Sequence, residues 1–270
     1  MSFHSFFLEK EVIYLRILTI GDLVGNIGIK KMKSVLNKIK EAEQIDFTIV
    51  NAENSAEGMG ITKKNFEDIL ETKIDAITMG NHTWGKKDIF GFIDHPKLIR
   101  PANYAEGIVG KGYNTYNCNN KKIAVINLIG RVDMNVLSEN PFLKVEKIVR
   151  ELQNKTDMIF IDFHAEATAE KIAMGYFLDG KITAMYGTHT HVQTADEKIL
   201  PNGTAYITDI GMTGPKNSVI GMDIEASLKR FKTTLPERYK IATGESIFNG
   251  VIFDTDDNTN KVKNIKRVQL

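Results

Sequence analysis

The sequence predicts an α/β fold, on three observations. Apolar runs of strand length alternate with amphipathic stretches of helical length along most of the chain. Polar residues that can bind metals directly follow several of the apolar runs. No low-complexity linker or break in composition divides the chain. We therefore expect an N-terminal extension at residues 1–14 and one domain over residues 15–270.

The expected elements follow from periodicity. Residues 30–43 place Met32, Val35, Leu36 and Ile39 on one helical face. Thr62 is a helix cap for residues 62–71, and Pro141 opens a helix over 141–152. Shorter helices are expected at 86–94 and 168–174, and a loop at 95–112. The expected strands are 15–20, 47–50, 76–79, 123–128, 158–163, 182–186 and 205–208, with an antiparallel edge pair at 247–254 and 261–270.

Composition excludes several function classes. The 270 residues are 42% hydrophobic and 26% charged, and the net charge is +1. No basic excess indicates stable binding to nucleic acid or to a membrane surface. No apolar run approaches the roughly 20 residues that span a bilayer. Cys118 is the only cysteine, which fits a reducing compartment, so we expect a cytoplasmic protein.

The candidate site is built around residues 75–84, DAITMGNHTW. An apolar strand ends here in Gly80, followed by Asn81 and His82. Open sheets place chemistry at the carboxyl ends of their strands. A solvated turn in which Asn81 serves as a cap is an equally good interpretation of this stretch alone. The other strand ends decide between the two.

The same pattern recurs at the other strand ends. Four of the six histidines occur at these ends, beside carboxylates and amides. Each residue alone has an ordinary structural explanation. If none of them bound a ligand, however, many unpaired polar groups would lie together at one edge of the sheet, which is energetically costly. Carboxylate, amide and imidazole ligands without thiolate favour Mn, Fe or Zn, and the number of ligands favours two ions. The candidate metal ligands are Asp22, Glu53, Asn54, Asn81, His164, His189 and His191.

The chain resembles the YmdB-like branch of the bacterial calcineurin-type metallophosphoesterases. The resemblance runs from about residue 15 to the C-terminus. It is carried, in order, by GDLVG, NAEN, ITMGNHTW, RPANY, FIDFHAEAT, GTHTHVQTAD and YITDIGMTGP. Val24 and Glu53 depart from the wider superfamily, in which a histidine and a bridging aspartate are usual. The YmdB-like branch shares these departures.

The resemblance implies a ligand set and a fold. Asp22, Glu53, Asn54 and His191 would hold one metal ion, with Glu53 bridging to a second ion. Asn81, His164 and His189 would complete the second site. The implied fold is two mixed β-sheets packed as a sandwich and flanked by helices. The implied ions are Fe or Mn.

The resemblance also implies an activity and an assembly. The activity is a phosphodiesterase acting on 2′,3′-cyclic and also 3′,5′-cyclic nucleotides, by attack of a metal-bridging hydroxide. The assembly is a homo-oligomer, a dimer or a tetramer.

His82 is the candidate catalytic residue. Consecutive residues at the end of a strand point different ways, so His82 should face the phosphate if Asn81 faces a metal ion. A histidine that only orients a metal ligand is the alternative.

Two other functions stay open at the level of sequence. One is a two-metal hydrolase that acts on phosphomonoesters or amides. The other is a nucleotide-binding regulatory protein with slow turnover.

Overall fold

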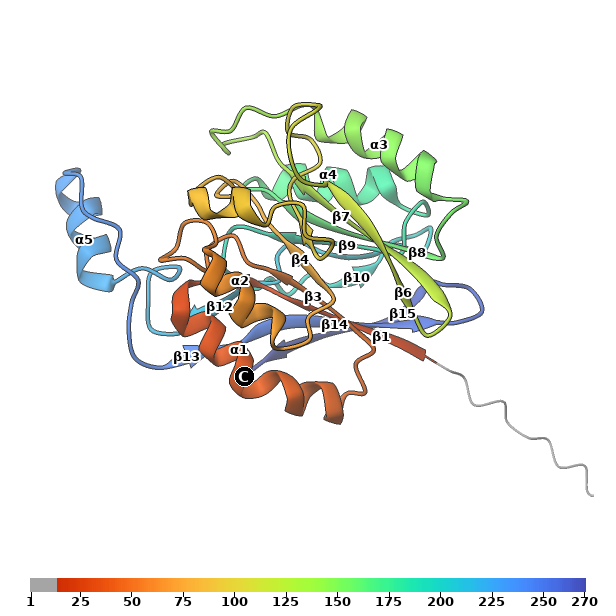
Figure 1. The fold of residues 1–270 in the computed structure, drawn as a ribbon, viewed down its shortest axis with the longest axis horizontal. Helices are drawn as coiled ribbons and strands as arrows, with labels where there is room; N and C mark the ends of the chain where they lie inside the picture. The colour runs from red at the N-terminus through yellow and green to blue at the C-terminus, as the bar shows by residue number, and fades with distance from the viewer. Residues whose placement is uncertain (1–13) are drawn as a thin grey trace, which may run out of the picture.

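The computed structural model describes residues 14–270, and Figure 1 shows its ribbon. Two six-stranded sheets make up most of the fold. The first sheet has the order β15 (Val262–Gln269), β14 (Asn249–Asp256), β1 (Tyr14–Ile20), β3 (Phe47–Asn51), β4 (Ala76–Thr78) and β5 (Leu98–Ile99). The second has the order β10 (Lys198–Ile199), β11 (Ala205–Ile207), β9 (Ala184–Thr188), β8 (Met158–His164), β7 (Lys121–Ile129) and β6 (Tyr113–Cys118).

Both sheets are mixed. In the first sheet β1, β3, β4 and β5 run parallel, and β14 and β15 add an antiparallel pair at one edge. In the second sheet β7, β8, β9 and β11 run parallel between antiparallel β6 and β10. Parallel strands end at the same side of a sheet, so the polar residues that follow them gather there.

The two sheets pack face to face. Leu15 and Ile17 of β1 belong to a buried cluster that also contains Phe160 and Tyr186 of the second sheet. Alternate positions of β1, such as Leu18, face the opposite side and pack with helical residues. The expected sandwich of two mixed sheets is therefore confirmed.

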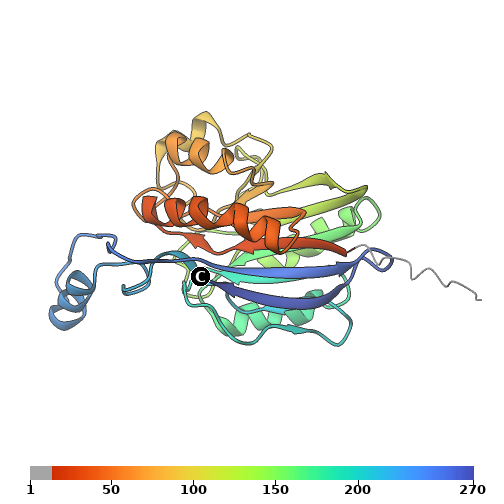
Figure 2. The ribbon, with the colours of Figure 1, turned by 90° about the horizontal axis from the view of Figure 1, so that it is seen from below.

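Helices cover the outer faces of both sheets, as Figures 1 and 2 show. α1 (Gly25–Ala42) and α2 (Lys63–Leu70) pack on the first sheet, with η1 (Lys87–Gly91) beside them. α3 (Pro141–Leu152) and α4 (Thr168–Leu178) pack on the second sheet. Among the described residues, no helix is both long and apolar enough to cross a membrane.

A small third sheet has the order β13 (Ser246–Ile247), β12 (Met212–Pro215) and β2 (Asp22–Leu23). Residues 216–245, between β12 and β13, form an excursion that we call the arm. The arm carries α5 (Ile224–Thr233), which stands away from the sheets in Figure 1. Asp223 caps α5 by accepting a hydrogen bond from the Ala226 amide at 3.0 Å.

The structure differs from the sequence predictions in its short elements. The expected loop at 95–112 contains β5, and the expected helix at 86–94 is the 3₁₀ helix η1. β2, β6, β10, β12, β13 and α5 were not expected. Most of these have two to four residues, too few to show a period. The expectation for residues 1–14 concerns residues that lie outside the described chain, except for Tyr14, which begins β1.

Candidate metal centre

The candidate ligands converge where strands of both sheets end. Asp22 follows β1, and Glu53 and Asn54 follow β3. Asn81 and His82 follow β4 in the first sheet. The second sheet supplies His164 at the end of β8, and His189 and His191 after β9. The centre therefore lies across the seam of the sandwich, at one end of it.

Four potential ligand atoms crowd around one point. Nε2 of His164 lies 2.9 Å from Oδ1 of Asn81, 3.1 Å from Oε1 of Glu53 and 3.0 Å from Nδ1 of His189. One imidazole nitrogen forms one normal hydrogen bond, so it cannot satisfy three partners. A cation among these atoms would satisfy all four. This convergence fits the expected second metal site.

Two buried oxygens of the candidate ligands lack a hydrogen-bond partner within the described chain. Oδ1 of Asp22 and Oδ1 of Asn54 accept no hydrogen bond. Both side chains are almost fully buried, with 0% and 2% of their surface exposed. A buried oxygen without a donor is costly, and a cation is a suitable partner for it. The orphaned oxygens fit the expected first metal site.

Gly80 keeps the space between the ligands open. A Cβ atom on this residue would lie 2.5 Å from Nε2 of His164 and closer still to Oε2 of Glu53. Any side chain here would push the two ligands apart. A glycine is therefore required at position 80, because both Glu53 and His164 approach its backbone too closely for a Cβ atom.

The three histidines are each anchored through one ring nitrogen. His191 donates from Nδ1 to the carbonyl oxygen of Ile220 at 2.8 Å. Nε2 of His189 lies 3.1 Å from the Glu166 carboxylate. Nδ1 of His164 lies 2.9 Å from Oγ1 of Thr188. Such outer contacts fix the tautomer and leave the other ring nitrogen to bind a metal.

The turn His189-Thr190-His191 is strained. The φ angles of His189 and His191 are 98° and 66°, in a region that non-glycine residues seldom adopt. The two rings consequently diverge, His189 toward His164 and His191 toward Ile220. Strain of this kind persists only where the surroundings enforce it.

A buried ion pair holds the turn. Oδ2 of Asp209 accepts hydrogen bonds from the amide and the hydroxyl of Thr190, at 3.0 and 2.8 Å. The same oxygen lies 2.7 Å from Nζ of Lys171, and both side chains are 0% exposed. Lys171 also donates to the Thr188 carbonyl at 2.8 Å. The ion pair thereby fixes the backbone on both sides of His189.

Asp162 supports the centre from below. Its Oδ1 accepts from Thr188 Oγ1 at 2.6 Å, so the Thr188 oxygen is left to accept from Nδ1 of His164. Its Oδ2 accepts from Thr78 and Asn51, at 2.5 and 3.0 Å. Asp162 therefore links strands of both sheets beneath the ligands.

Burial and neighbouring charges shift the acidity of the ligands. Burial raises the pKa of Asp22 to about 6. Burial, with the neighbouring His164, lowers the pKa of His189 to about 3, which keeps it neutral as a metal ligand must be. Burial opposes the charge on Glu53 and on His164. Their mutual attraction outweighs it, so the pKa of Glu53 falls well below its usual range and that of His164 rises to about 9. A bound cation would take the place of the His164 proton.

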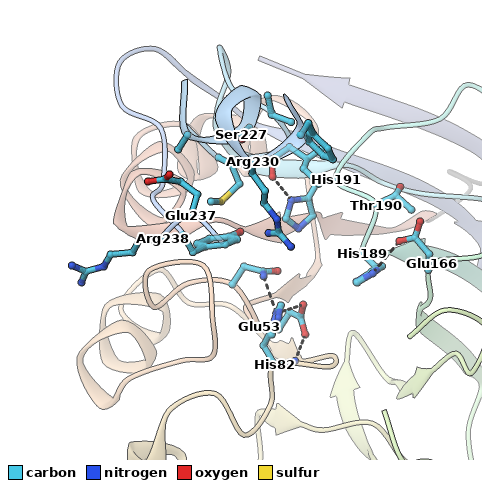
Figure 3. A pocket seen from close by; sticks show the side chains of 17 residues that line it. Glu53, His82, Glu166, His189, Thr190, His191, Ser227, Arg230, Glu237 and Arg238 are labelled. Carbon is cyan, nitrogen blue, oxygen red and sulfur yellow. Dashed lines mark hydrogen bonds and ion pairs between the residues drawn. The ribbon is translucent and has the colours of Figure 1, made fainter. Parts of the chain in front are cut away.

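A pocket of about 320 Å³ opens above the centre, as Figure 3 shows. Its floor contains Glu53, Asn54, His82, His189 and His191. Its opposite wall comes from the arm and includes Ile220, Met222, Arg230, Phe231 and Tyr239. His82 lies at the boundary with its side chain 27% exposed, and its Nδ1 is 3.1 Å from Oε1 of Glu53.

The structure brings all eight predicted residues to one site, though not into one set of contacts. Glu53, Asn81, His82, His164 and His189 are joined by direct contacts. Asp22 reaches the cluster through its 3.1 Å hydrogen bond with the His189 amide, and Asn54 through His82 at 3.2 Å. His191 forms no hydrogen bond with the others, but it lines the same pocket and its charge acts to lower the pKa of Asp22.

The sequence reasoning missed the supporting residues. Asp162 and Asp209 are charged residues inside the apolar runs IFIDFH and YITDIG. A carboxylate in such a run is unusual, and this pattern could have identified both residues as buried supports of the site. Glu166 follows His164 closely enough to have been considered. Nothing in the sequence indicated that Lys171, Arg230 and Tyr239 belong to the site. The elements that carry them come close to the site only when the chain is folded.

Several known proteins are similar to this chain in sequence and in fold. The model of the YmdB-like protein family matches residues 18–268. A 2′,3′-cyclic-nucleotide 2′-phosphodiesterase of Bacillus subtilis is 52% identical over 257 residues, 95% of this chain and 97% of that protein. A crystal structure from Mycoplasma pneumoniae, described as a novel phosphatase, superposes with a TM-score of 0.91 at 36% identity, covering 96% of this chain and 94% of that one. A hypothetical protein from Thermus thermophilus gives a TM-score of 0.89 at 32% identity, covering 95% and 99%.

Proposed function

Because the chain belongs to the YmdB-like family, we propose that it is a metal-dependent hydrolase that cleaves phosphodiesters, with 2′,3′-cyclic nucleotides as substrates. The observation that carries the proposal is the crowding of Glu53, Asn81 and His189 around Nε2 of His164, on the floor of an open pocket. The activity of the Bacillus subtilis relative supports the choice of substrate.

We assign the residues to two metal sites. Asp22, Glu53, Asn54 and His191 would hold one ion, and Asn81, His164 and His189 would hold the other, with Glu53 shared between the two sites. The orphaned oxygens of Asp22 and Asn54 support the first assignment. Two bound ions supply an activated water and neutralise charge on the phosphate. Oxygen and nitrogen donors fit Mn, Fe or Zn, and the resemblance to the metallophosphoesterases narrows the proposal to Fe or Mn.

His82 is the catalytic residue of the proposal. Its ring lines the pocket, above Glu53 and beside Asn54. In this place it can donate a hydrogen bond to a phosphate oxygen or a proton to the leaving alkoxide. General acid catalysis of this kind contributes roughly 10²–10⁴-fold to a rate.

A metal and substrate panel tests the function. Protein purified without chelators is analysed for metals, then assayed on 2′,3′-cyclic AMP, 3′,5′-cyclic AMP and nitrophenyl phosphate. We expect hydrolysis of 2′,3′-cyclic AMP that is lost on removing metal and restored by Mn or Fe, with slower turnover of 3′,5′-cyclic AMP. Full activity in verified metal-free protein would contradict the proposal. A preference for nitrophenyl phosphate would instead assign a phosphomonoesterase.

The cellular setting belongs to the same proposal. We place the protein in the cytoplasm as a homo-oligomer. Large apolar side chains on α5, namely Ile224, Leu228 and Phe231, are 45%, 53% and 77% exposed and support packing against a second copy. Light scattering measures the assembly. Leu228→Asp should reduce its mass if this face is the interface.

A further inference from the structure

The arm is firmly attached at its base. Its two ends pair through β12 and β13, where Gly214 lies opposite Ile247 and Pro215 opposite Ser246. The pairing continues into the arm, from the Lys216 amide to the Glu245 carbonyl at 2.9 Å. The arm is therefore an extension of the small sheet, and its pocket-facing residues have defined positions.

The arm also contacts the candidate metal centre directly. The carbonyl oxygen of Ile220 accepts the hydrogen bond from Nδ1 of His191. The Ala242 amide donates to the Gly221 carbonyl at 3.0 Å, which joins the two chain segments of the arm next to Ile220. The position of the arm is thus coupled to the orientation of His191.

Tyr239 offers a fixed aromatic surface to the pocket. Its ring packs over Gly58, where an added Cβ atom would clash with Cε1 of the ring. Gly58 is in turn held by Asn54, whose side-chain amide donates to the Gly58 carbonyl at 2.9 Å. Burial raises the pKa of the Tyr239 hydroxyl, so the group stays neutral. One side of the ring is supported by the loop of a candidate ligand, and the residue lines the pocket.

Arg230 offers a positive charge to the same space. Its side chain points from α5 into the pocket, toward His191 (Figure 3). Within residues 14–270 it has no ion-pair or hydrogen-bond partner, whereas its neighbour Lys229 pairs with Glu237 at 2.7 Å. A guanidinium group that has no partner in the described chain and faces the position proposed for the phosphate is suited to bind phosphate oxygens.

The pocket therefore has two different sides. The floor presents candidate metal ligands. The arm presents Tyr239, Met222 and two arginines, of which Arg230 points toward His191 and Arg238 points away from it (Figure 3). A small phosphodiester would use the floor and Arg230 and would leave the ring of Tyr239 without a partner. A ligand with an anionic end and a flat apolar end would use both sides.

We propose that the arm is the specificity element of this enzyme: Tyr239 packs against the base of a nucleotide while Arg230 pairs with its phosphate. This inference rests on the proposed phosphodiesterase function. It assigns base selectivity to Tyr239, and it assigns phosphate binding to Arg230 together with the floor.

The kinetic test compares a substrate that has a base with one that lacks it. Aromatic stacking on a base is worth roughly 1–3 kcal/mol. Tyr239→Ala should therefore lower kcat/KM for 2′,3′-cyclic AMP about tenfold or more, mainly through KM, and leave glycerol 1,2-cyclic phosphate unaffected. Tyr239→Phe should retain the wild-type values. Tyr176→Ala, at an exposed tyrosine of α4 outside the pocket, is the matched control.

Arg230 should respond differently. Arg230→Ala should lower kcat/KM for both substrates, because both carry the phosphate, and Arg230→Lys should restore part of the loss. Lys232→Ala, on the same helix but not at the pocket, is the control. An equal effect of Tyr239→Ala on both substrates, or no effect on either, would overturn the role of the arm in base selectivity.

A binding experiment separates failure of this inference from failure of the proposed function. Adenosine 3′-monophosphate and inorganic phosphate are titrated into wild type and Tyr239→Ala by calorimetry. We expect the substitution to weaken adenosine 3′-monophosphate alone. If wild type hydrolyses neither cyclic substrate, the proposed function fails, and the titration still decides the inference: equal affinity of both proteins for adenosine 3′-monophosphate would reject it.

Discussion

Nε2 of His164 lies 3.1 Å from Oε1 of Glu53, although the two residues belong to different sheets. Glu53 follows β3 of the first sheet, and His164 ends β8 of the second. The contact therefore forms only when the sandwich is closed. A metal ion bound by both side chains would hold the two sheets together at this end.

The first prediction concerns the space between these two residues. Gly80→Ala should abolish metal binding, because the new Cβ atom would lie within 2.5 Å of both ligands. Metal content by mass spectrometry and turnover should fall together. The matched control is Gly91→Ala, since a Cβ atom there meets nothing within 4 Å. A Gly80→Ala protein with full metal content would contradict the role given to Gly80.

The second prediction separates the bridging carboxylate from its neighbour. Glu53→Gln should reduce turnover more than Asn54→Ala, because the carboxylate balances charge on both ions and the amide supplies one neutral oxygen. The Glu53→Gln loss should exceed the roughly 10–100-fold that removal of a ligand's outer partner costs. Metal stoichiometry is measured for both variants. Two bound ions and a near-normal rate in Glu53→Gln would show that Glu53 is not the bridge.

The third prediction concerns His82. His82→Ala and His82→Asn should keep both metal ions while the rate falls. The fall should be smaller for nitrophenyl phosphodiesters, whose leaving group needs little protonation. The contact between His82 and Glu53 makes the metal measurement decisive. Loss of an ion in His82→Ala, with activity rescued by excess metal, would make His82 a positioning residue.

The fourth prediction concerns the stability of the metal-free protein. Burial raises the pKa of Asp22 from 3.8 to about 6, so its ionised form destabilises the metal-free fold above pH 6. The cost is absent below about pH 4, where the group is protonated in both states. Asp22→Asn should therefore raise the free energy of unfolding of chelator-treated protein at pH 8, by up to about 3 kcal/mol. The gain should disappear toward pH 4.

The same substitution should weaken metal binding, because it removes a charged ligand. Thermal unfolding at pH 8 with and without Mn measures both effects. A lower melting temperature for metal-free Asp22→Asn at pH 8 would contradict the account of the burial of Asp22.

The fifth prediction concerns residues 1–14. A chain that starts at Leu15 should fold and keep its activity. β1 pairs with β14 from Tyr14 to Ile20, so within residues 14–270 the truncation removes the terminal pair, Tyr14 with Asp256. Circular dichroism and turnover of 2′,3′-cyclic AMP check this result. A truncated protein that folds but is inactive would show that the extension contributes to the site.

The sequence alone predicted the main strands, four of the five α-helices in the described chain, and the residues that gather at the candidate site. Long apolar runs such as residues 158–163 leave few alternatives to a buried strand, and polar ligands at their ends stand out against them. The short elements could not be predicted from the sequence, because a strand of two residues such as β5 is too short to show an alternation of apolar and polar side chains. α5 was missed although Ile224, Leu228 and Phe231 recur on it at helical spacing, and this apolar face packs on neither sheet.

Only the tertiary structure decided how the site residues meet. Glu53 and His164 come together because two sheets pack, and no spacing along the chain encodes that contact. The strained φ angles of His189 and His191 depend on the buried pair of Lys171 and Asp209, which lie on other elements. The sequence specifies the chemistry of every side chain, so it was sufficient to select the candidate ligands. Distances between elements arise from packing, so the pocket, its arm and the supporting ion pair appeared only in the fold.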